Sequence, residues 1–134
     1  MEKYYFIVSI LFFIGLIFWA VAIIHKYSRR KKLSAELKKT FLKHFGAIQQ
    51  KKNNPKEQII NYDKLYHKVL QGYGYQGSFG EILKTEPNEI GNIQRVWNLH
   101  KLRNKLVHEF DLMSVAVLKK KVGEYEKELR FLMK

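Results

Sequence analysis

One stretch of the chain, residues 97–109, gathers an arginine, an amide and two histidines in an otherwise amphipathic pattern. In a helix each residue advances by about 100°, so Asn104 and His108 fall about 40° and 80° from His100, and Arg103 about 60° to its other side. The apolar side chains occupy an arc of the same helix: Val96, Leu99, Leu102, Leu106, Val107 and Phe110. A helix that only packs a core does not need such polar groups together at the border of its apolar stripe. We therefore interpret this helix as the carrier of a candidate site.

These residue types fit acid–base chemistry on a phosphate ester. An arginine holds a phosphate and offsets the charge of a pentavalent intermediate, and a histidine with a pKa of about 6.5 takes or gives a proton at neutral pH. RNA supplies its own nucleophile, the 2′-hydroxyl. A metal-free transesterification therefore needs little beyond Arg103 and His108, with Asn104 orienting one of them. His100, one turn before Asn104, is an accessory candidate for a second proton carrier.

Other chemistries have less support in this sequence. The five histidines include no pair four residues apart with an acidic neighbour, and the chain has no cysteine. His100 and His108 are about 12 Å apart along the helix axis, which is too far for them to share one ion. We therefore expect no metal ion and no cofactor. Ser78 and Ser114 are better explained as helix caps than as nucleophiles.

The same spacing also fits a purely structural role. Arg103 would then bond helix-end carbonyls or Glu109, and His108 would be a half-buried residue near a helix terminus. If the site is catalytic, one helix face offers few groups, and two copies across a symmetric dimer would double them. Both interpretations stay open at this level.

Residues 55–134 predict an all-α bundle that positions the candidate site. Asn54 and Pro55 begin a helix as its cap and its first residue. Apolar residues then recur three and four apart, the spacing of a core-facing seam. They are Ile59, Tyr62, Tyr66, Val69 and Tyr73. No window shows the alternation of a half-buried strand for long enough to matter.

Two more caps mark out the remaining helices. Ser78 and Glu81 have the capping-box form and open a short helix. A break at residues 85–88 precedes the helix with the candidate site, and Ser114 caps the last helix. The last helix has a regular apolar seam of Val115, Leu118, Val122, Tyr125, Leu129 and Leu132. The expected architecture is a compact up-down bundle, small enough to make dimerisation attractive.

The amino-terminal residues 1–25 predict a single transmembrane anchor. Residues 4–24 carry no charge, and they reach about 31 Å as a helix against a hydrocarbon core of about 30 Å. A basic cluster follows, made of Lys26, Arg29, Arg30, Lys31 and Lys32. By the positive-inside rule, the amino terminus lies outside the cell membrane and the domain in the cytoplasm. The alternative is a signal peptide cut near residues 20–22, but the apolar run continues past that point and the basic block opposes translocation.

The positive charge of the chain is concentrated beside this anchor. Residues 25–56 hold eleven Lys and Arg and one acid, hence +10, whereas residues 57–134 hold thirteen and ten, hence +3, of a total of +13. The domain with the candidate site is therefore almost neutral, and composition is a weak argument for RNA binding. The lack of cysteine excludes disulfides and is compatible with a reducing compartment.

Residues 26–54 are expected to form a basic juxtamembrane helix and a linker. A narrow apolar stripe recurs at helical spacing: Leu33, Leu37, Phe41, Phe45 and Ile48. Three surfaces for this stripe stay open, namely the bundle, a partner protein or second copy, and an anionic bilayer, near which each basic residue gains about 1 kcal/mol. The periodicity stops before residues 54–55, where we place the domain boundary.

The run Leu102–Glu109 resembles the signature of the HEPN superfamily, in which a helical bundle carries an arginine, four to six intervening residues and a histidine. Arg103, Asn104 and His108 match it, with a polar residue directly after the arginine. The resemblance extends over roughly residues 56–134, to small bacterial HEPN-like proteins. It implies an all-helical, usually dimeric domain. Many such domains are metal-independent ribonucleases, and others act as nucleotide-binding or interaction modules.

Our leading hypothesis from the sequence is a membrane-anchored, dimeric HEPN-like domain that faces the cytoplasm and cleaves RNA. Arg103 would bind the scissile phosphate, His108 would be the acid and base, and Asn104 would orient one of them. The rival is a non-catalytic, membrane-tethered module that binds a protein partner or a nucleotide.

Overall fold

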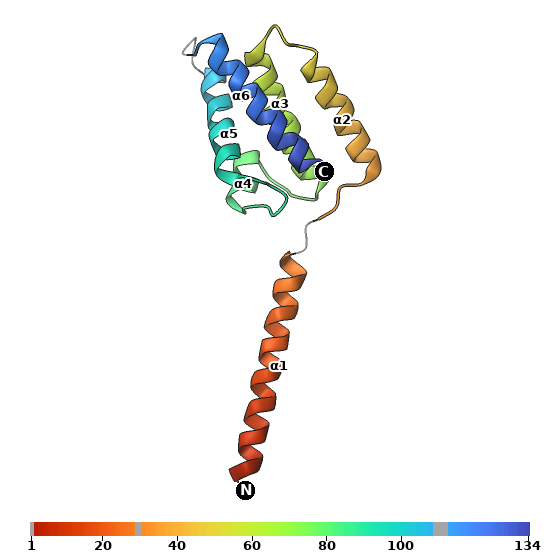
Figure 1. Ribbon diagram of the computed structural model, residues 1–134, viewed down its shortest axis with the longest axis vertical. Helices are drawn as coiled ribbons and strands as arrows, with labels where there is room; N and C mark the ends of the chain where they lie inside the picture. Colours follow the sequence, from red (N-terminus) through yellow and green to blue (C-terminus); the bar gives the residue numbers. More distant parts are fainter. Residues whose placement is uncertain (1, 29–30, 109–112) are drawn as a thin grey trace. The chain divides into compact units, whose positions relative to one another are not determined.

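Figure 1 shows the computed structural model of the chain, which describes residues 2–28, 31–108 and 113–134. All regular elements in these ranges are helices: α1 (Glu2–Ser28), α2 (Ala35–Gln49), α3 (Pro55–Gly72), α4 (Phe79–Lys84), α5 (Ile93–His108) and α6 (Val115–Leu132). The prediction of an all-α protein is confirmed for the part of the chain described. The chain divides into two compact units, Met1–Arg30 and Lys31–Lys134, which we describe separately.

The first unit is the long apolar helix α1. Its stretch Lys3–His25 is long and apolar enough to cross a membrane, judged by length and composition. From Tyr4 to Ile24 its large apolar side chains are exposed, and each would gain roughly 1.5–3 kcal/mol from an apolar environment. This helix meets the physical requirement for the predicted anchor.

Three helices of the second unit, α3, α4 and α6, begin at the side-chain caps that the sequence predicted. Asn54 accepts a first-turn backbone N–H at 3.0 Å, and Pro55 lies in that turn. Ser78 and Glu81 form the reciprocal capping box, and Ser114 caps α6. Each cap satisfies a backbone donor that the helix itself leaves unpaired and contributes about 1 kcal/mol.

Helix α5 begins later than the break at residues 85–88 suggested. It starts at Ile93, because the Asn92 carboxamide accepts the backbone N–H of Arg95 at 2.9 Å and so acts as the cap. The segment before it is packed, with Glu89 only 5% exposed. The predicted start was too early because Pro87 was interpreted as the start signal of this helix.

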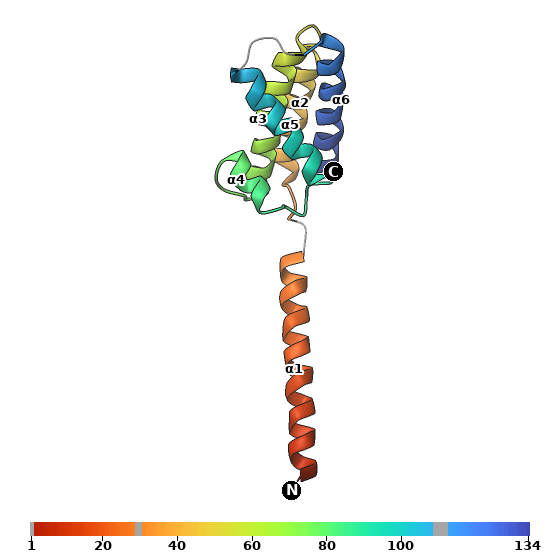
Figure 2. The same cartoon turned by 90° about the vertical axis from the view of Figure 1, so that its left-hand side faces the viewer.

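Helix α3 is the centre of the second unit, where it packs against α2, α5 and α6 (Figures 1 and 2). The seams predicted for α3 and α6 are buried, except that Val115 is exposed and Tyr73 is half-buried. Tyr62 of α3 contacts Phe45 of α2 and Tyr125 of α6, with ring centroids 5.5 and 6.3 Å apart. These seams join the three helices in one core.

Helix α2 is part of this core, so that the compact unit starts at Lys31 and includes residues expected to lie between anchor and bundle. The buried members of its stripe are Phe41, Phe45 and Ile48. Of the three surfaces that the sequence left open for the stripe, the bundle therefore takes it. The contact is close, because a Cβ at Gly72 of α3 would lie 2.9 Å from Leu33 and 3.0 Å from Phe41.

The first residue of this unit is fixed to the bundle. The Lys31 backbone N–H donates to Glu89 Oε1 at 2.7 Å, and the Tyr75 hydroxyl donates to Glu89 Oε2 at 2.7 Å. The Lys31 ammonium also lies 4.0 Å from the centre of the Tyr75 ring. Lys31 of the predicted membrane-surface cluster therefore belongs to the folded domain, and Lys32 is exposed. The other members, Arg29, Arg30 and the side chain of Lys26, lie outside the described residues.

Candidate functional site

Three residues of the predicted site meet around a buried carboxylate, Asp63 of α3. Asp63 Oδ1 accepts hydrogen bonds from His100 Nδ1 at 2.9 Å and from the Tyr125 hydroxyl at 2.7 Å. Arg103 Nε lies 3.6 Å from Asp63 Oδ2. Asn104 Oδ1 accepts from Arg103 Nη1 at 3.0 Å, and Asn104 Nδ2 lies 3.5 Å from His100 Nε2. The predicted residues of α5 thus form one network that joins α5 to α3 and α6.

The Asp63 carboxylate determines which nitrogen of His100 is available. A carboxylate only accepts hydrogen bonds, so in the tautomer that this contact selects His100 Nδ1 carries the proton and Nε2 is the acceptor. Asn104 offers a donor to that acceptor. A carboxylate behind a histidine is the arrangement that holds a general base in the correct tautomer and orientation. His100 is therefore positioned as a proton carrier.

Aromatic packing holds the His100 ring from α4. Phe79 lies edge-on to it with ring centroids 4.7 Å apart, and the side chain of His100 is 14% exposed. A Cβ placed at Gly80 would lie 4.0 Å from His100 Nε2, so the backbone of α4 approaches the ring closely. The short helix α4, opened by its capping box, serves to close this side of the site.

Arg103 faces both the carboxylate and the surface. Its Nε is buried and makes no hydrogen bond, since 3.6 Å to Asp63 is an ion-pair distance and too long for a hydrogen bond. The Asp63 charge is thereby compensated in the interior. The side chain is 25% exposed, and among the described residues Asn104 is the one hydrogen-bond partner of its terminal nitrogens. The remaining N–H groups are available to an anion.

Tyr125 is a donor in this network. Burial, and then the neighbouring Asp63 carboxylate, raise the pKa of the Tyr125 hydroxyl far above its ordinary value. The phenol therefore stays protonated at every physiological pH and donates to Asp63. It anchors the carboxylate from α6 and takes no part in proton transfer.

The structure does not bring His108 into this network. His108 is the last residue of α5, is exposed, and has no polar partner among the residues that the structure describes. It lies five residues after Arg103, about 7.5 Å further along the axis. The alternative that His108 is half-buried is wrong. The alternative contact between Arg103 and Glu109 falls on a residue outside the described ranges.

Sequence reasoning missed Asp63 and Tyr125. Asp63 directly follows Tyr62 of the α3 seam, and Tyr125 is itself a seam residue of α6. The available signal was the charge of Asp63, because a carboxylate on the buried side of a helix requires a partner. That partner comes from other helices, and the sequence of α3 alone does not name it.

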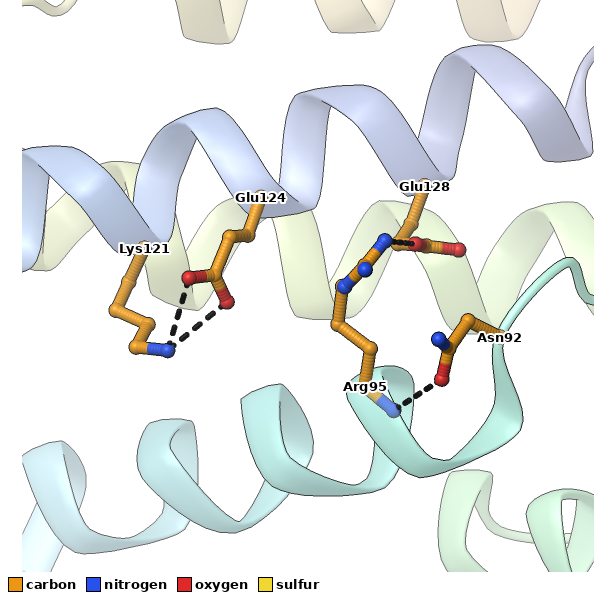
Figure 3. A network of polar contacts seen from close by, with 5 residues as sticks. All are labelled: Asn92, Arg95, Lys121, Glu124 and Glu128. Atoms are coloured by element: carbon orange, nitrogen blue, oxygen red, sulfur yellow. Dashed lines mark hydrogen bonds and ion pairs between the residues drawn. The ribbon is translucent and has the colours of Figure 1, made fainter.

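A second set of polar residues lies on α5 and α6, where one ion pair joins the two helices (Figure 3). Arg95 Nη1 lies 2.6 Å from Glu128 Oε1, and the side chain of Glu128 is 4% exposed. Lys121 and Glu124 pair on α6 at 2.9 Å. The cation and carboxylate of the first pair neutralise each other, and the five residues of this network include no histidine to carry a proton. We regard this network as structural.

The described residues contain no group of three or more His, Asp and Glu side chains placed to hold a metal ion. No family model, curated protein or solved structure matches the chain. The chemistry of the Asp63 network and the character of α1 are therefore the basis for a functional assignment.

Proposed function

We propose that the protein is a single-pass membrane protein that presents a metal-independent RNA-cleaving site, in a HEPN-like helical domain, at the cytoplasmic face of the cell membrane. The observation that carries the proposal is the Asp63–His100 pair at 2.9 Å, with Arg103 and Asn104 beside it. It combines an oriented proton carrier with an anion-binding cation on one flank of α5. These are the groups that transesterification of RNA requires.

The reaction has a simple atom balance. A histidine takes the proton of the 2′-hydroxyl, the 2′-oxygen forms a bond to phosphorus, and the bond from phosphorus to the 5′-oxygen breaks. A second histidine gives a proton to the departing 5′-oxygen. Arg103 binds the phosphate through its outer N–H groups and offsets the added charge. The products are a 2′,3′-cyclic phosphate and a free 5′-hydroxyl.

Two proton carriers on one phosphate require two copies of the domain. His100 and His108 of one chain are about 12 Å apart along α5, so we place His108 of one copy opposite the His100 network of the other. Exposed apolar side chains at the carboxyl end of α5 and around the start of α6 support this homodimer. They are Val107, Met113, Val115 and Val117. Burial of such a patch against its twin would stabilise the dimer and complete the site.

The membrane placement rests on α1 and on the charge that follows it. The apolar stretch Lys3–His25 has the length of a span, and the basic cluster of residues 26–32 comes directly after it. By the positive-inside rule, the amino terminus lies outside and the domain in the cytoplasm, where RNA is present. The basic cluster would also bind anionic lipid headgroups.

The test is cleavage of RNA by the full chain in detergent micelles, with a metal chelator present. We expect the wild-type protein to cut single-stranded RNA to cyclic phosphates, and Arg103→Ala and His108→Ala to lose about 10²–10⁴-fold in rate. Lys101→Ala, on an exposed position of the same helix, is the matched control and keeps the rate.

Two outcomes would overturn the proposal. One is equal cleavage by wild type and the His108→Ala variant, and the other is no cleavage by a dimeric wild-type sample. If loss of His100 or Arg103 changes only thermal stability, the Asp63 network is structural and the protein is a tethered binding module.

A further inference from the structure

A groove of about 430 Å³ lies between α2 and α3. On α2 and its carboxyl end the lining positions are 44, 47, 48 and 51, and on α3 they include 61, 64, 65 and 68. Each set has the spacing of one helix face, so the groove runs along both helices. From position 61 to position 71 it extends about 15 Å. Its shape is elongated and suits a segment of chain.

The floor and the walls of this groove differ in character. The apolar floor consists of the core residues Ile48 and Leu65 and the exposed Ala47. Lys51, Lys64 and Lys68 line the sides together with His44 and His67. No carboxylate lines it. Lys51 is paired with Glu57, whereas Lys64 and Lys68 have no ionic partner among the residues described. The groove therefore has an apolar floor and, on its α3 side, two lysines without an ionic partner.

A second hollow on the molecule has no such polarity. It is lined by Lys52, Lys119 and Glu126 together with several glutamines, so that cations and a carboxylate lie in one surface. Charge does not select a ligand there. Although the whole chain is basic, the two hollows therefore differ: only the α2–α3 groove is lined by lysines without a carboxylate.

We propose that the α2–α3 groove binds a short acidic amphipathic helix of a partner protein. Such a helix presents apolar side chains every three and four residues to the floor and carboxylates to Lys64 and Lys68 on the α3 side. A helix of about ten residues is 15 Å long, which is the extent of the groove. A nucleic-acid strand would use the lysines but has no use for the apolar floor. Asp63 and Lys64 are about 100° apart on α3, so this surface is separate from the proposed cleavage site.

The experiment uses the full chain and a dye in the groove. The chain has no cysteine, so Ala47→Cys and Ala116→Cys, both at exposed positions, each receive one environment-sensitive fluorophore. The probe is a synthetic fourteen-residue helix with leucines on one face and glutamates on the other. A scrambled peptide of equal composition is its control. Because the dye reports from its own site, binding of the peptide to the detergent micelle gives no signal at position 47.

We expect the patterned peptide to shift the dye at position 47 and not at position 116, and the scrambled peptide to bind at least about tenfold more weakly. Lys64→Glu with Lys68→Glu should weaken binding about tenfold or more. Lys101→Glu with Lys105→Glu is the matched control, since these lysines are also exposed and one turn apart on a helix. It changes the net charge equally and should leave binding within about twofold.

Several outcomes overturn the proposal. They are equal binding of both peptides, equal losses in the two charge-reversed pairs, and no shift of the dye at position 47. A larger shift with single-stranded RNA than with the peptide would assign the groove to nucleic acid and would also reject the acidic helix. Failure of RNA cleavage leaves this prediction unaffected, since the readout does not involve the cleavage site.

Discussion

The two histidines of α5 lie on one helix in opposite environments. His100 is held by Asp63 at 2.9 Å, is packed against Phe79 and is mostly buried. His108 is exposed at the end of the helix and has no polar partner in the described part of the chain. A buried, oriented histidine is expensive to remove because its partners lose their bonds, whereas an exposed one costs the fold almost nothing. The difference separates a group that stabilises the domain from a group that only a ligand or a second copy would use.

Removal of Asp63 should have the largest effect on the molecule. In Asp63→Ala, the hydroxyl of Tyr125 and the charge of Arg103 lose a buried partner, and we expect a loss of about 3–5 kcal/mol in the free energy of unfolding. Chemical denaturation followed by circular dichroism measures it. Asp63→Asn, which keeps an acceptor, should lose less. A loss below about 0.5 kcal/mol for Asp63→Ala would show that the network does not hold the bundle together.

Substitution of His108 should separate function from stability. In His108→Ala we expect RNA cleavage to fall about 10²–10⁴-fold while the free energy of unfolding stays within about 0.5 kcal/mol. His100→Ala should lower both. If His108→Ala destabilises the domain as much as His100→Ala does, the proposed difference between a stabilising His100 and a dispensable His108 is wrong.

A smaller stability effect should follow from the hydroxyl of Tyr125. Tyr125→Phe removes one hydrogen bond to a buried carboxylate, and we expect a loss of about 1.5–3 kcal/mol. The ring stays in the core, so packing is preserved. Thermal unfolding of Tyr125→Phe beside Tyr62→Phe gives the contrast, because the Tyr62 hydroxyl donates to Glu126, which is only half-buried.

The apolar surface at the carboxyl end of α5 and around the start of α6 should control assembly without changing the fold. Val117 is 42% exposed, so Val117→Asp should cost the monomer less than about 1 kcal/mol. It should weaken self-association by at least about tenfold and reduce cleavage in proportion to the loss of dimer. Sedimentation at several protein concentrations measures the association. If the wild-type protein is a monomer at all concentrations, the proposed homodimer is wrong.

The smallest effect is expected at the capping box of α4, which is exposed and makes no hydrogen bond to either histidine. The Ser78 backbone N–H, and then its hydroxyl, lower the pKa of the Glu81 carboxyl. A carboxyl whose pKa is lower in the folded state stabilises the fold at pH values above its ordinary pKa, and this contribution is lost as the pH falls through the folded value. Glu81→Gln should therefore flatten the acid limb of the stability curve slightly. An unchanged acid limb would show that the Glu81 side chain makes no measurable contribution to the stability of the fold.

Much of the helical framework was predictable because its signals are local. Asn54, Ser78 and Ser114 cap the helices that they were expected to cap, and the seams of α3 and α6 are mostly buried as their spacing predicted. The start of α5 was not predictable in this way. Pro87 and Asn92 are both typical of a helix start, and only the packing of the segment between them decides which one begins the helix.

The candidate site was predictable only in its α5 half. Helical periodicity places Arg103, Asn104 and His100 on neighbouring positions whatever else the chain does, and the structure joins them. Asp63 lies on α3, 37 residues before its partner His100, and Tyr125 lies on α6, 62 residues after Asp63. No local spacing encodes such distances.

The sequence by itself determined the helices, the caps of α3, α4 and α6, the apolar character of α1 and the concentration of charge beside it, because each of these depends on residues within a few positions of one another. Only the tertiary structure decided that α2 packs on α3, that Asp63 collects the polar groups of α5 and α6, and that His108 stays outside them. The physical reason is that a buried carboxylate requires partners from whichever helices surround it, and the packing of the whole core selects those helices.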